Sequence, residues 1–176
     1  MLFRSPDAFH PYYGLTESLC STIPQGQALV RLTLSRAGIA EHRVRAAATG
    51  DEDAITLVGN GQPVGDTEVL AVNPDTGHPT GPDEIGEIWL RGRAITPGYV
   101  GQGLDPAAWQ GRLQGQPADT APFFRTGDLG FLREGQVFIT GRLKELLIVR
   151  GKNHYPLDIE ATVLQATRPM GRSEEH

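Results

Sequence analysis

Residues 124–151 read FRTGDLGFLREGQVFITGRLKELLIVRG, and this stretch decides the fold. Its two apolar runs, at residues 129–132 and 136–140, lie on either side of an Arg-Glu-Gly sequence at 133–135 that is a compact hairpin signal. A continuous apolar run at residues 146–149 follows and predicts a further short strand. The stretch therefore predicts a strand-rich protein built around an antiparallel hairpin.

Upstream of the hairpin, the sequence predicts several more short strands. Residues 28–34 alternate, so that Val30, Leu32 and Leu34 share one face of a half-buried strand. Further strands are predicted at 55–58, 66–73 and 85–91, while residues 35–53 are interpreted as a polar, alanine-rich connection. The chain contains 22 glycines and 13 prolines, which favour turns and short strands over a helical bundle.

The strand at 85–91 has two distinct faces, and a turn precedes it. Ile88 and Leu90 share one face, and Trp89 and Arg91 share the other. The Asn-Pro-Asp-Thr-Gly sequence at residues 73–77 is a strong turn signal. The strands at 66–73 and 85–91 are therefore predicted to form a hairpin with a long loop.

Two helices are predicted in the second half of the chain. Asp105 and Pro106 open a short one, with Asp as the cap and Pro at the first helical position. Pro156 begins a second helix over residues 157–167. In it, three side chains form an apolar stripe: Ile159, Val163 and Leu164.

Charge and composition exclude several classes of function. The 176 residues carry a net charge of −5, which argues against a broad electrostatic surface for nucleic acid or for an anionic membrane. No stretch approaches the roughly 18 uncharged apolar residues that a membrane-spanning helix needs. Cys20 is the one cysteine, so no intrachain disulfide can form. These features lead us to expect a cytoplasmic protein.

The first segment with chemical potential is Tyr13-Gly14-Leu15-Thr16-Glu17. An aromatic ring can stack on a base, and a glycine lets the backbone approach a ligand closely. A hydroxyl can bond a phosphate oxygen, and the neighbouring carboxylate can hold a Mg²⁺ that the phosphate shares. Taken alone, the segment fits an ordinary surface turn better.

The second segment is Phe124-Arg125-Thr126-Gly127-Asp128. A carboxylate fixed after a glycine turn can accept two hydrogen bonds from a vicinal diol, such as the ribose 2′ and 3′ hydroxyls. Taken alone, the segment is better interpreted as an Asp128 that opens a hairpin strand.

The third segment runs over residues 141–151 and continues through residues 153–160. In order and at these spacings, the three segments resemble the adenylate-forming superfamily of acyl-CoA synthetases, nonribosomal adenylation domains and firefly-type luciferases. A fourth signature of that superfamily is similar to the GEIWLRG sequence at 86–92, followed by Gly98-Tyr99. Within the superfamily, residues 149–160 and 34–44 resemble the fatty acyl-AMP ligases.

The resemblance implies an α+β, β-rich fold with a defined domain order. Residues 1–140 would form the end of the large AMP-binding domain, with a small β-barrel-like subdomain at about 55–140. Residues 141–145 would be the hinge, and residues 146–168 the truncated start of the small, mobile α/β domain. The tail at 169–176 is expected to be disordered.

The resemblance also implies a role for each site residue. Tyr13 would lie against adenine, with Gly14 and Leu15 beside it. Thr16 would bond the α-phosphate and Glu17 would hold Mg²⁺. Ile139 would form an apolar wall against the base, and Asp128 would bind the ribose hydroxyls. Arg142 would contact the ribose or a phosphate, and Lys144 would be the hinge.

The implied reaction is the activation of a fatty acid with ATP, which gives an acyl-adenylate and pyrophosphate. Acyl-AMP ligases pass the acyl group to the phosphopantetheine thiol of an acyl carrier protein, often a carrier domain at the start of polyketide or lipopeptide assembly. Complete members also have a lysine-ending phosphate loop and a catalytic lysine in the small domain, and neither is found in these 176 residues. The isolated chain is therefore expected to be inactive.

Two alternatives stay open at this point. The first is a fragment of an acyl-CoA synthetase, for which the acceptor would be CoA instead of a carrier protein. The second is a non-catalytic remnant that binds nucleotide weakly or serves as an interaction module.

Overall fold

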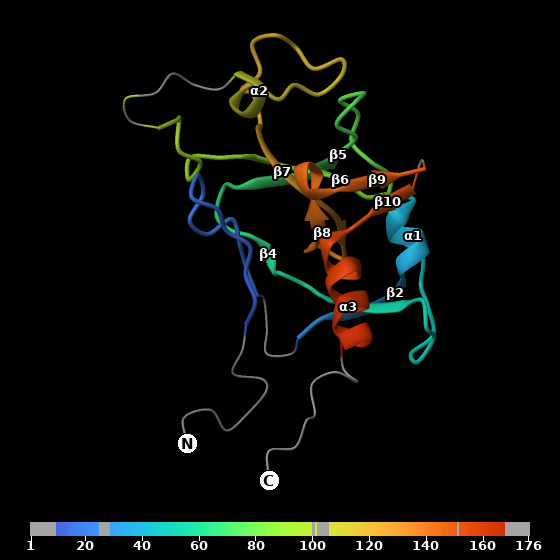
Figure 1. The fold of residues 1–176 in the computed structure, drawn as a ribbon. Coiled ribbons are helices and arrows are strands. Elements are labelled where there is room, and N and C mark those ends of the chain that lie inside the picture. Colours follow the sequence, from blue (N-terminus) through green and yellow to red (C-terminus); the bar gives the residue numbers. More distant parts are fainter. Residues whose placement is uncertain (1–9, 25–28, 100, 102–105, 151, 168–176) are drawn as a thin grey trace.

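The computed structural model describes residues 10–24, 29–99, 101, 106–150 and 152–167. Its centre is a four-stranded antiparallel sheet in the order β5-β6-β7-β8 (Figure 1). These strands span Glu68–Val72, Gly86–Arg91, Phe124–Arg133 and Gln136–Arg142, respectively. The strand-rich α+β fold is thus confirmed.

Three two-stranded antiparallel sheets accompany the central one. They pair β1 (Thr22–Ile23) with β4 (Gln62–Pro63), β2 (Arg31–Ser35) with β3 (Ala54–Val58), and β9 (Leu147–Val149) with β10 (Lys152–His154). Within the described residues the strands therefore form four separate sheets, not one closed barrel.

The predicted hairpin is the β7–β8 pair. Arg133 pairs with Gln136, so Glu134 and Gly135 form a two-residue turn. Both have positive φ, 51° and 76°, as the type I′ turns that match strand twist require. Both strands extend beyond the predicted apolar runs, because β7 begins at Phe124 and β8 continues to Arg142.

The β5–β6 pair confirms the other predicted hairpin and the two faces of β6. Ile88 and Leu90 pack in a cluster with Phe124, whereas Trp89 packs with Phe123 on the opposite face. The connecting turn begins where Asn73 Oδ1 accepts hydrogen bonds from the backbone N–H groups of residues 75 and 76, at 3.0 and 3.1 Å.

Residues 36–40, which the sequence assigns to a polar connection, form the short helix α1 (Arg36–Ala40). Ser35 caps it by accepting a hydrogen bond from the Gly38 N–H at 2.9 Å. A five-residue helix spans little more than one turn, so no apolar periodicity announces it. Another difference lies at Val30, which precedes β2 and is exposed, whereas Leu34 is buried as predicted.

The short helix predicted at Pro106 is present as α2 (Pro106–Trp109), and its expected cap Asp105 lies outside the described residues. No helix in the described ranges is long and apolar enough to cross a membrane.

After β8 the chain forms a 3₁₀ turn, η2 (Leu143–Glu145), then the β9–β10 hairpin and α3 (Pro156–Thr167). Tyr155, just before α3, is buried in the cluster that contains Ile39 and Phe131, and its hydroxyl donates to the Ile39 carbonyl at 3.3 Å. β10 accordingly lies beside α1 (Figure 1). The expected tail at 169–176 lies outside the described residues.

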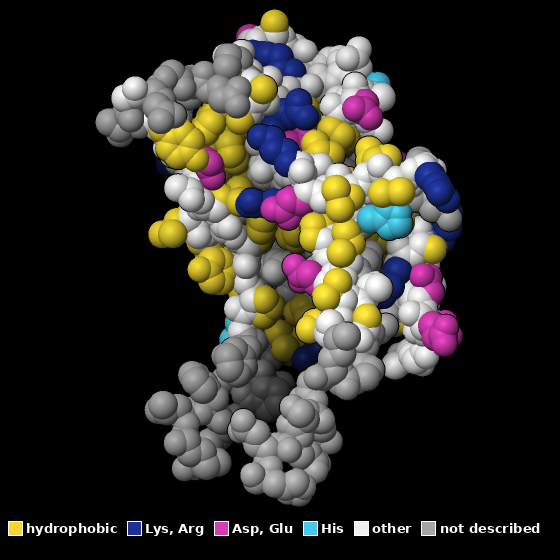
Figure 2. Space-filling view, viewed as in Figure 1, with side chains coloured by type: hydrophobic (Ala, Val, Ile, Leu, Met, Phe, Trp, Pro, Cys, Tyr) yellow, Lys and Arg dark blue, Asp and Glu magenta, His cyan; other side chains and the backbone are white. Residues whose placement is uncertain are grey.

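The apolar stripe predicted on α3 lies at the surface. Ile159, Val163 and Leu164 are 39%, 54% and 66% exposed. The residues of β9 are also exposed, and Figure 2 shows hydrophobic side chains gathered on the face where β9 and α3 lie. The helix is therefore present as predicted, but its stripe does not pack against the core.

Candidate nucleotide site

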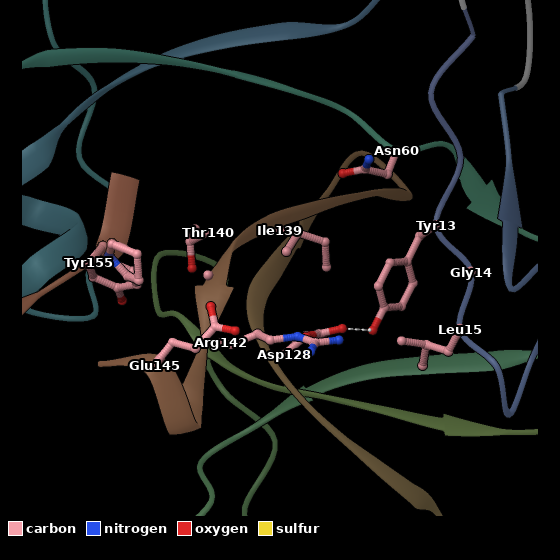
Figure 3. A pocket seen from close by; sticks show the side chains of 12 residues that line it. Tyr13, Gly14, Leu15, Asn60, Asp128, Ile139, Thr140, Arg142, Glu145 and Tyr155 are labelled. Carbon is pink, nitrogen blue, oxygen red and sulfur yellow. Dashed lines mark hydrogen bonds and ion pairs between the residues drawn. The ribbon is translucent and has the colours of Figure 1, made fainter. Parts of the chain in front are cut away.

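A cavity of about 490 Å³ opens between the β7–β8 hairpin and the turn that follows Tyr13 (Figure 3). It gathers residues from five separate parts of the chain. Its lining residues are Tyr13, Gly14, Leu15, Asn60, Asp128, Ile139, Thr140, Gly141, Arg142, Glu145, Tyr155 and Pro156. Six of these are residues for which the sequence predicted a nucleotide role.

Asp128 enters this cavity because the β6–β7 ladder is interrupted. Glu87 pairs with Leu129 and Trp89 pairs with Arg125, so three residues of β7, at 126–128, stand opposite Ile88 alone. Such bulges redirect side chains and are common beside functional sites. Gly127 has a φ of 73°, a left-handed conformation that glycine adopts without strain. We call residues 126–128 the bulge.

Hydrogen bonds from its neighbours fix the bulge. The Thr126 hydroxyl donates to the Ile88 carbonyl at 2.7 Å and accepts from the Asp128 N–H at 3.0 Å. The Gly127 N–H donates to Glu87 Oε1 at 3.0 Å. Backbone groups that the ladder leaves unpaired are thereby satisfied, which holds Asp128 in one place.

Asp128 is 4% exposed, and its carboxylate is hydrogen-bonded at both oxygens. Oδ2 accepts from the Tyr13 hydroxyl at 2.6 Å, and Oδ1 accepts from Arg142 Nε at 2.8 Å (Figure 3). Burial, and then the nearby Asp128 charge, raise the pKa of Tyr13, so this hydroxyl stays protonated and remains a donor. The hydrogen bond to Asp128 and its charge also raise the pKa of Arg142.

The turn after Tyr13 has the predicted irregular form. Leu15 and Ser18 exchange backbone hydrogen bonds at 2.8 and 3.1 Å, and the Tyr13 carbonyl accepts from two backbone N–H groups, at residues 21 and 22. A Cβ on Gly14 would lie 2.3 Å from the Leu19 carbonyl oxygen. The close approach of the backbone at Gly14 therefore excludes a side chain.

Thr16 and Glu17 face a second hollow next to the first. The two hollows share Gly14, Leu15 and Arg142, so the predicted phosphate and metal residues adjoin the Asp128 cavity. The Glu17 side chain accepts a hydrogen bond from the Tyr99 hydroxyl, which raises the pKa of Tyr99. No group of three or more His, Cys, Asp or Glu side chains suited to a metal occurs in the described ranges.

Lys144 lies at the surface in η2, between β8 and β9. It borders a third cleft of about 720 Å³, together with Glu17 and Arg142. All nine residues that the sequence singled out therefore line three adjoining hollows.

Several residues of the site were not predicted as functional. The first cavity is also lined by four residues whose role no local sequence signal could have indicated: Asn60, Thr140, Glu145 and Tyr155. Tyr99 and Glu87 lie in the stretch that carried the fourth signature, so that pattern could have indicated them.

The arrangement suits a ligand that carries both a diol and an anionic group. The Asp128 carboxylate can accept hydrogen bonds from hydroxyls, and Arg142 is a permanent cation beside it. Ile139 adds an apolar side chain to the lining of the same cavity. A nucleotide has all three matching features.

Comparison with known proteins identifies the family of the chain. A family profile described as "AMP-binding enzyme" matches residues 2–100. The medium-chain-fatty-acid–[acyl-carrier-protein] ligase JamA of Moorena producens is 38% identical over 171 residues, which are 95% of this chain and 28% of JamA. The long-chain-fatty-acid–AMP ligase FadD26 of Mycobacterium tuberculosis is 38% identical over 168 residues, which are 93% of this chain and 29% of FadD26.

The fold also matches solved structures. The fatty acid AMP ligase of Legionella pneumophila superimposes with a TM-score of 0.72 at 39% identity, covering 92% of this chain and 28% of that one. A fatty acyl-adenylate ligase of the same organism, solved with acyl adenylate and pyrophosphate, matches with the same values. The chain thus spans less than a third of the length of these relatives.

Proposed function

The chain belongs to the AMP-binding enzyme family, and from that premise we propose that it supplies part of the nucleotide site of a fatty acyl-AMP ligase. In the proposed reaction, a fatty acid carboxylate oxygen attacks the α-phosphorus of ATP. The bond to the β-phosphate oxygen breaks, and the products are an acyl-adenylate and pyrophosphate. A carrier-protein phosphopantetheine thiol then attacks the acyl carbonyl, and AMP leaves.

The observation that carries this proposal is the Asp128 carboxylate held between Tyr13 and Arg142. Its two oxygens are oriented by those donors at 2.6 and 2.8 Å, and each oxygen has further lone pairs. Ribose hydroxyls would bind there, with the base against Ile139 and the Tyr13 region. Positioning of this kind accounts for much of the rate enhancement in group transfer.

The phosphates would extend toward Thr16 and Arg142. The Thr16 hydroxyl would donate to an α-phosphate oxygen, and the Arg142 guanidinium would stabilise the charge that develops there. Both residues border the hollow that adjoins the Asp128 cavity.

Glu17 is suited to a Mg²⁺ ion that the phosphates share. Mg²⁺ usually takes one or two protein carboxylates and completes its shell with water and substrate phosphates, so one carboxylate suffices. Glu17 borders the same hollow as Thr16 and has a hydroxyl partner in Tyr99. The bound ion would neutralise phosphate charge.

The choice of fatty acid and of carrier protein rests on the relatives. JamA is named for a medium-chain fatty acid and an acyl carrier protein, and FadD26 for a long-chain fatty acid and AMP. We propose the same class of substrate and acceptor for the protein that contains this chain, in polyketide or lipopeptide assembly, with ATP and Mg²⁺ as cofactors.

The test uses the complete reading frame that encodes this chain. Pyrophosphate release should require a fatty acid, ATP and Mg²⁺, and the acyl group should pass to a phosphopantetheinylated carrier protein and not to CoA. The 176-residue chain alone should bind ATP but release no pyrophosphate. Transfer to CoA would favour an acyl-CoA synthetase, and absence of pyrophosphate release from the complete protein would favour a non-catalytic remnant.

A further inference from the structure

Glu87 is a buried charge outside the residues assigned so far. The residue is 2% exposed and lies in β6, where it pairs with Leu129, the residue directly after the bulge. Removing a carboxylate from water is costly, and an apolar side chain of similar size often gives equal or better stability. A carboxylate in this position therefore points to a requirement for its geometry.

Four N–H groups converge on Glu87. Oε2 accepts from Trp89 Nε1 and Arg125 Nε, both at 2.9 Å, and forms an ion pair with the second Arg125 nitrogen at 2.8 Å. Oε1 accepts from the Gly127 N–H at 3.0 Å. The Arg125 guanidinium also lies over the Trp89 ring, 5.3 Å from its centre.

The residues that donate to Glu87 come from both strands of the interrupted ladder, β6 and β7. Trp89 and Arg125 are the pair that closes the ladder before the bulge, and Gly127 is its middle residue. Glu87 thus connects the last regular pair to the backbone of the bulge. Because Asp128 directly follows Gly127, any change in the position of the Gly127 N–H moves the carboxylate of Asp128.

We infer that Glu87 is a positioning residue: its carboxylate takes the place of the missing ladder partner and sets where Asp128 meets the ribose of a bound nucleotide. The inference rests on the proposed function for the identity of the ligand. The position of Glu87 and its contacts with the bulge do not depend on the proposed function, because they are present in the protein without a ligand.

A second ion pair in the same sheet provides the matched control. Glu68 in β5 stands directly opposite Arg91 in β6, and its carboxylate accepts from Arg91 Nε at 2.9 Å. It bonds no backbone group of the bulge. Glu68→Gln therefore makes the same chemical change to an Arg partner in this sheet while leaving the bulge contacts in place.

The experiment compares Glu87→Gln, Glu87→Asp and Glu68→Gln in the 176-residue chain. Glu87→Gln removes the charge, and Glu87→Asp keeps it on a shorter side chain that cannot reach both Arg125 and Gly127. If Glu87→Gln fails to fold, Glu87→Asp decides the result. The first measurement is amide hydrogen exchange at Gly127 by NMR, without nucleotide.

The second measurement is discrimination between nucleotides that have and lack the diol. Kd is measured for ATP and for 2′,3′-dideoxy-ATP in each variant. Losing a well-placed hydrogen bond costs about tenfold in binding. Both Glu87 variants should therefore raise Gly127 exchange about tenfold or more and reduce the preference for ATP about tenfold. Glu68→Gln should change neither quantity.

Two results would overturn the inference. One is Gly127 exchange and nucleotide preference that stay at wild-type values in both Glu87 variants. The other is equal weakening of ATP and dideoxy-ATP, since that indicates a structural role alone. A wild-type chain that does not distinguish the two nucleotides would instead contradict the ribose role of Asp128, while Gly127 exchange would still decide the position of the bulge.

Discussion

The Tyr13 hydroxyl donates to Asp128 Oδ2 at 2.6 Å although the two residues are 115 positions apart in the sequence. This hydrogen bond connects the turn at the start of the described chain to the central sheet. The same carboxylate holds Arg142 through its other oxygen, so three segments meet at one anionic group.

Removing the charge at Asp128 should abolish most of the nucleotide affinity. Asp128→Asn keeps the shape but weakens two charge-assisted hydrogen bonds to the diol, each worth about 1.5–3 kcal/mol. In the complete enzyme the KM for ATP should rise and kcat/KM should fall by about 100-fold or more. Steady-state kinetics with varied ATP measure this change.

The matched control is Asp83→Asn, which removes an exposed carboxylate that pairs with Arg133. Exposed pairs contribute about 1 kcal/mol or less, so the ATP kinetics should be unchanged. Unchanged ATP kinetics in Asp128→Asn as well would reduce Asp128 to a structural role in its hairpin.

The stability of the chain should fall as the pH rises above about 10. Burial and the Asp128 charge raise the pKa of Tyr13 in the folded state, whereas the unfolded state titrates at its ordinary value of 10.0. The folded state therefore retains a proton that the unfolded state loses. The resulting stability is complete below the unfolded pKa and is lost with a slope of up to about 1.4 kcal/mol per pH unit above it.

Urea unfolding at several pH values measures this slope, and Tyr13→Phe should reduce it. Tyr99→Phe is the comparison, because Tyr99 is exposed and its pKa is raised first by the Glu17 hydrogen bond and only then by burial, so this variant should reduce the slope less than Tyr13→Phe. A Tyr13→Phe variant with the wild-type slope would contradict the assignment of the effect to Tyr13.

The conformation of Gly127 should matter for binding as well as for stability. An added Cβ would meet nothing within 4 Å, so Gly127→Ala is strained only by its φ of 73°. The expected loss of stability is about 1–2 kcal/mol. Gly65→Ala, with a φ of 61° and equally open space, should lose a similar amount.

The two glycine variants should differ in nucleotide binding, which isothermal titration with ATP measures. Gly127→Ala disturbs the residue before Asp128 and should weaken binding, whereas Gly65 lies in the connection before β5 and should have no effect. Equal ATP affinities would show that the bulge tolerates this strain without moving Asp128.

Lys144 remains the predicted hinge, and proline at this position tests it. Lys144→Pro would fix φ near −65° and remove an N–H, so it should impair one half-reaction of the complete enzyme more than the other. Acyl-adenylate formation and transfer to the carrier thiol are measured separately. Lys144→Ala is the control, because it removes the charge but keeps the backbone free.

A hinge motion would have to break specific contacts. Asn153 donates to the Ala40 carbonyl at 2.9 Å, and Tyr155 is buried beside Ile39. The structure therefore shows one docked arrangement of the segment after η2. Equal losses in both half-reactions of Lys144→Pro would argue for a rigid connection.

Local sequence signals predicted the elements whose causes are local. The β7–β8 turn depends on Glu134 and Gly135, and the faces of β6 follow from strict alternation. α1 was missed because it is stabilised by its Ser35 cap and by burial of Ile39, not by periodicity. The stripe on α3 shows the converse, since the helix forms where its apolar pattern predicts it but the three stripe residues stay 39% to 66% exposed.

The candidate site was found through resemblance and not through local pattern. Nothing near Tyr13 in the sequence indicates that its hydroxyl meets Asp128, because that contact depends on how the sheet brings distant segments together. The bulge was also invisible to alternation, which assumes an uninterrupted ladder. In the sequence, Glu87 was only part of a signature, because its burial and its hydrogen bond to the Gly127 N–H arise only in the folded chain.

The bulge has a consequence for how this protein can vary in length. Phe124 packs in one hydrophobic cluster and Leu129 in another, so the number of residues between them is fixed by the packing at both ends. A single insertion or deletion there would turn Leu129 and Phe131 toward the opposite face of the sheet. Point substitutions in this segment can change its chemistry without changing the fold. Insertions and deletions would disrupt folding, so natural selection would remove them whatever their effect on activity.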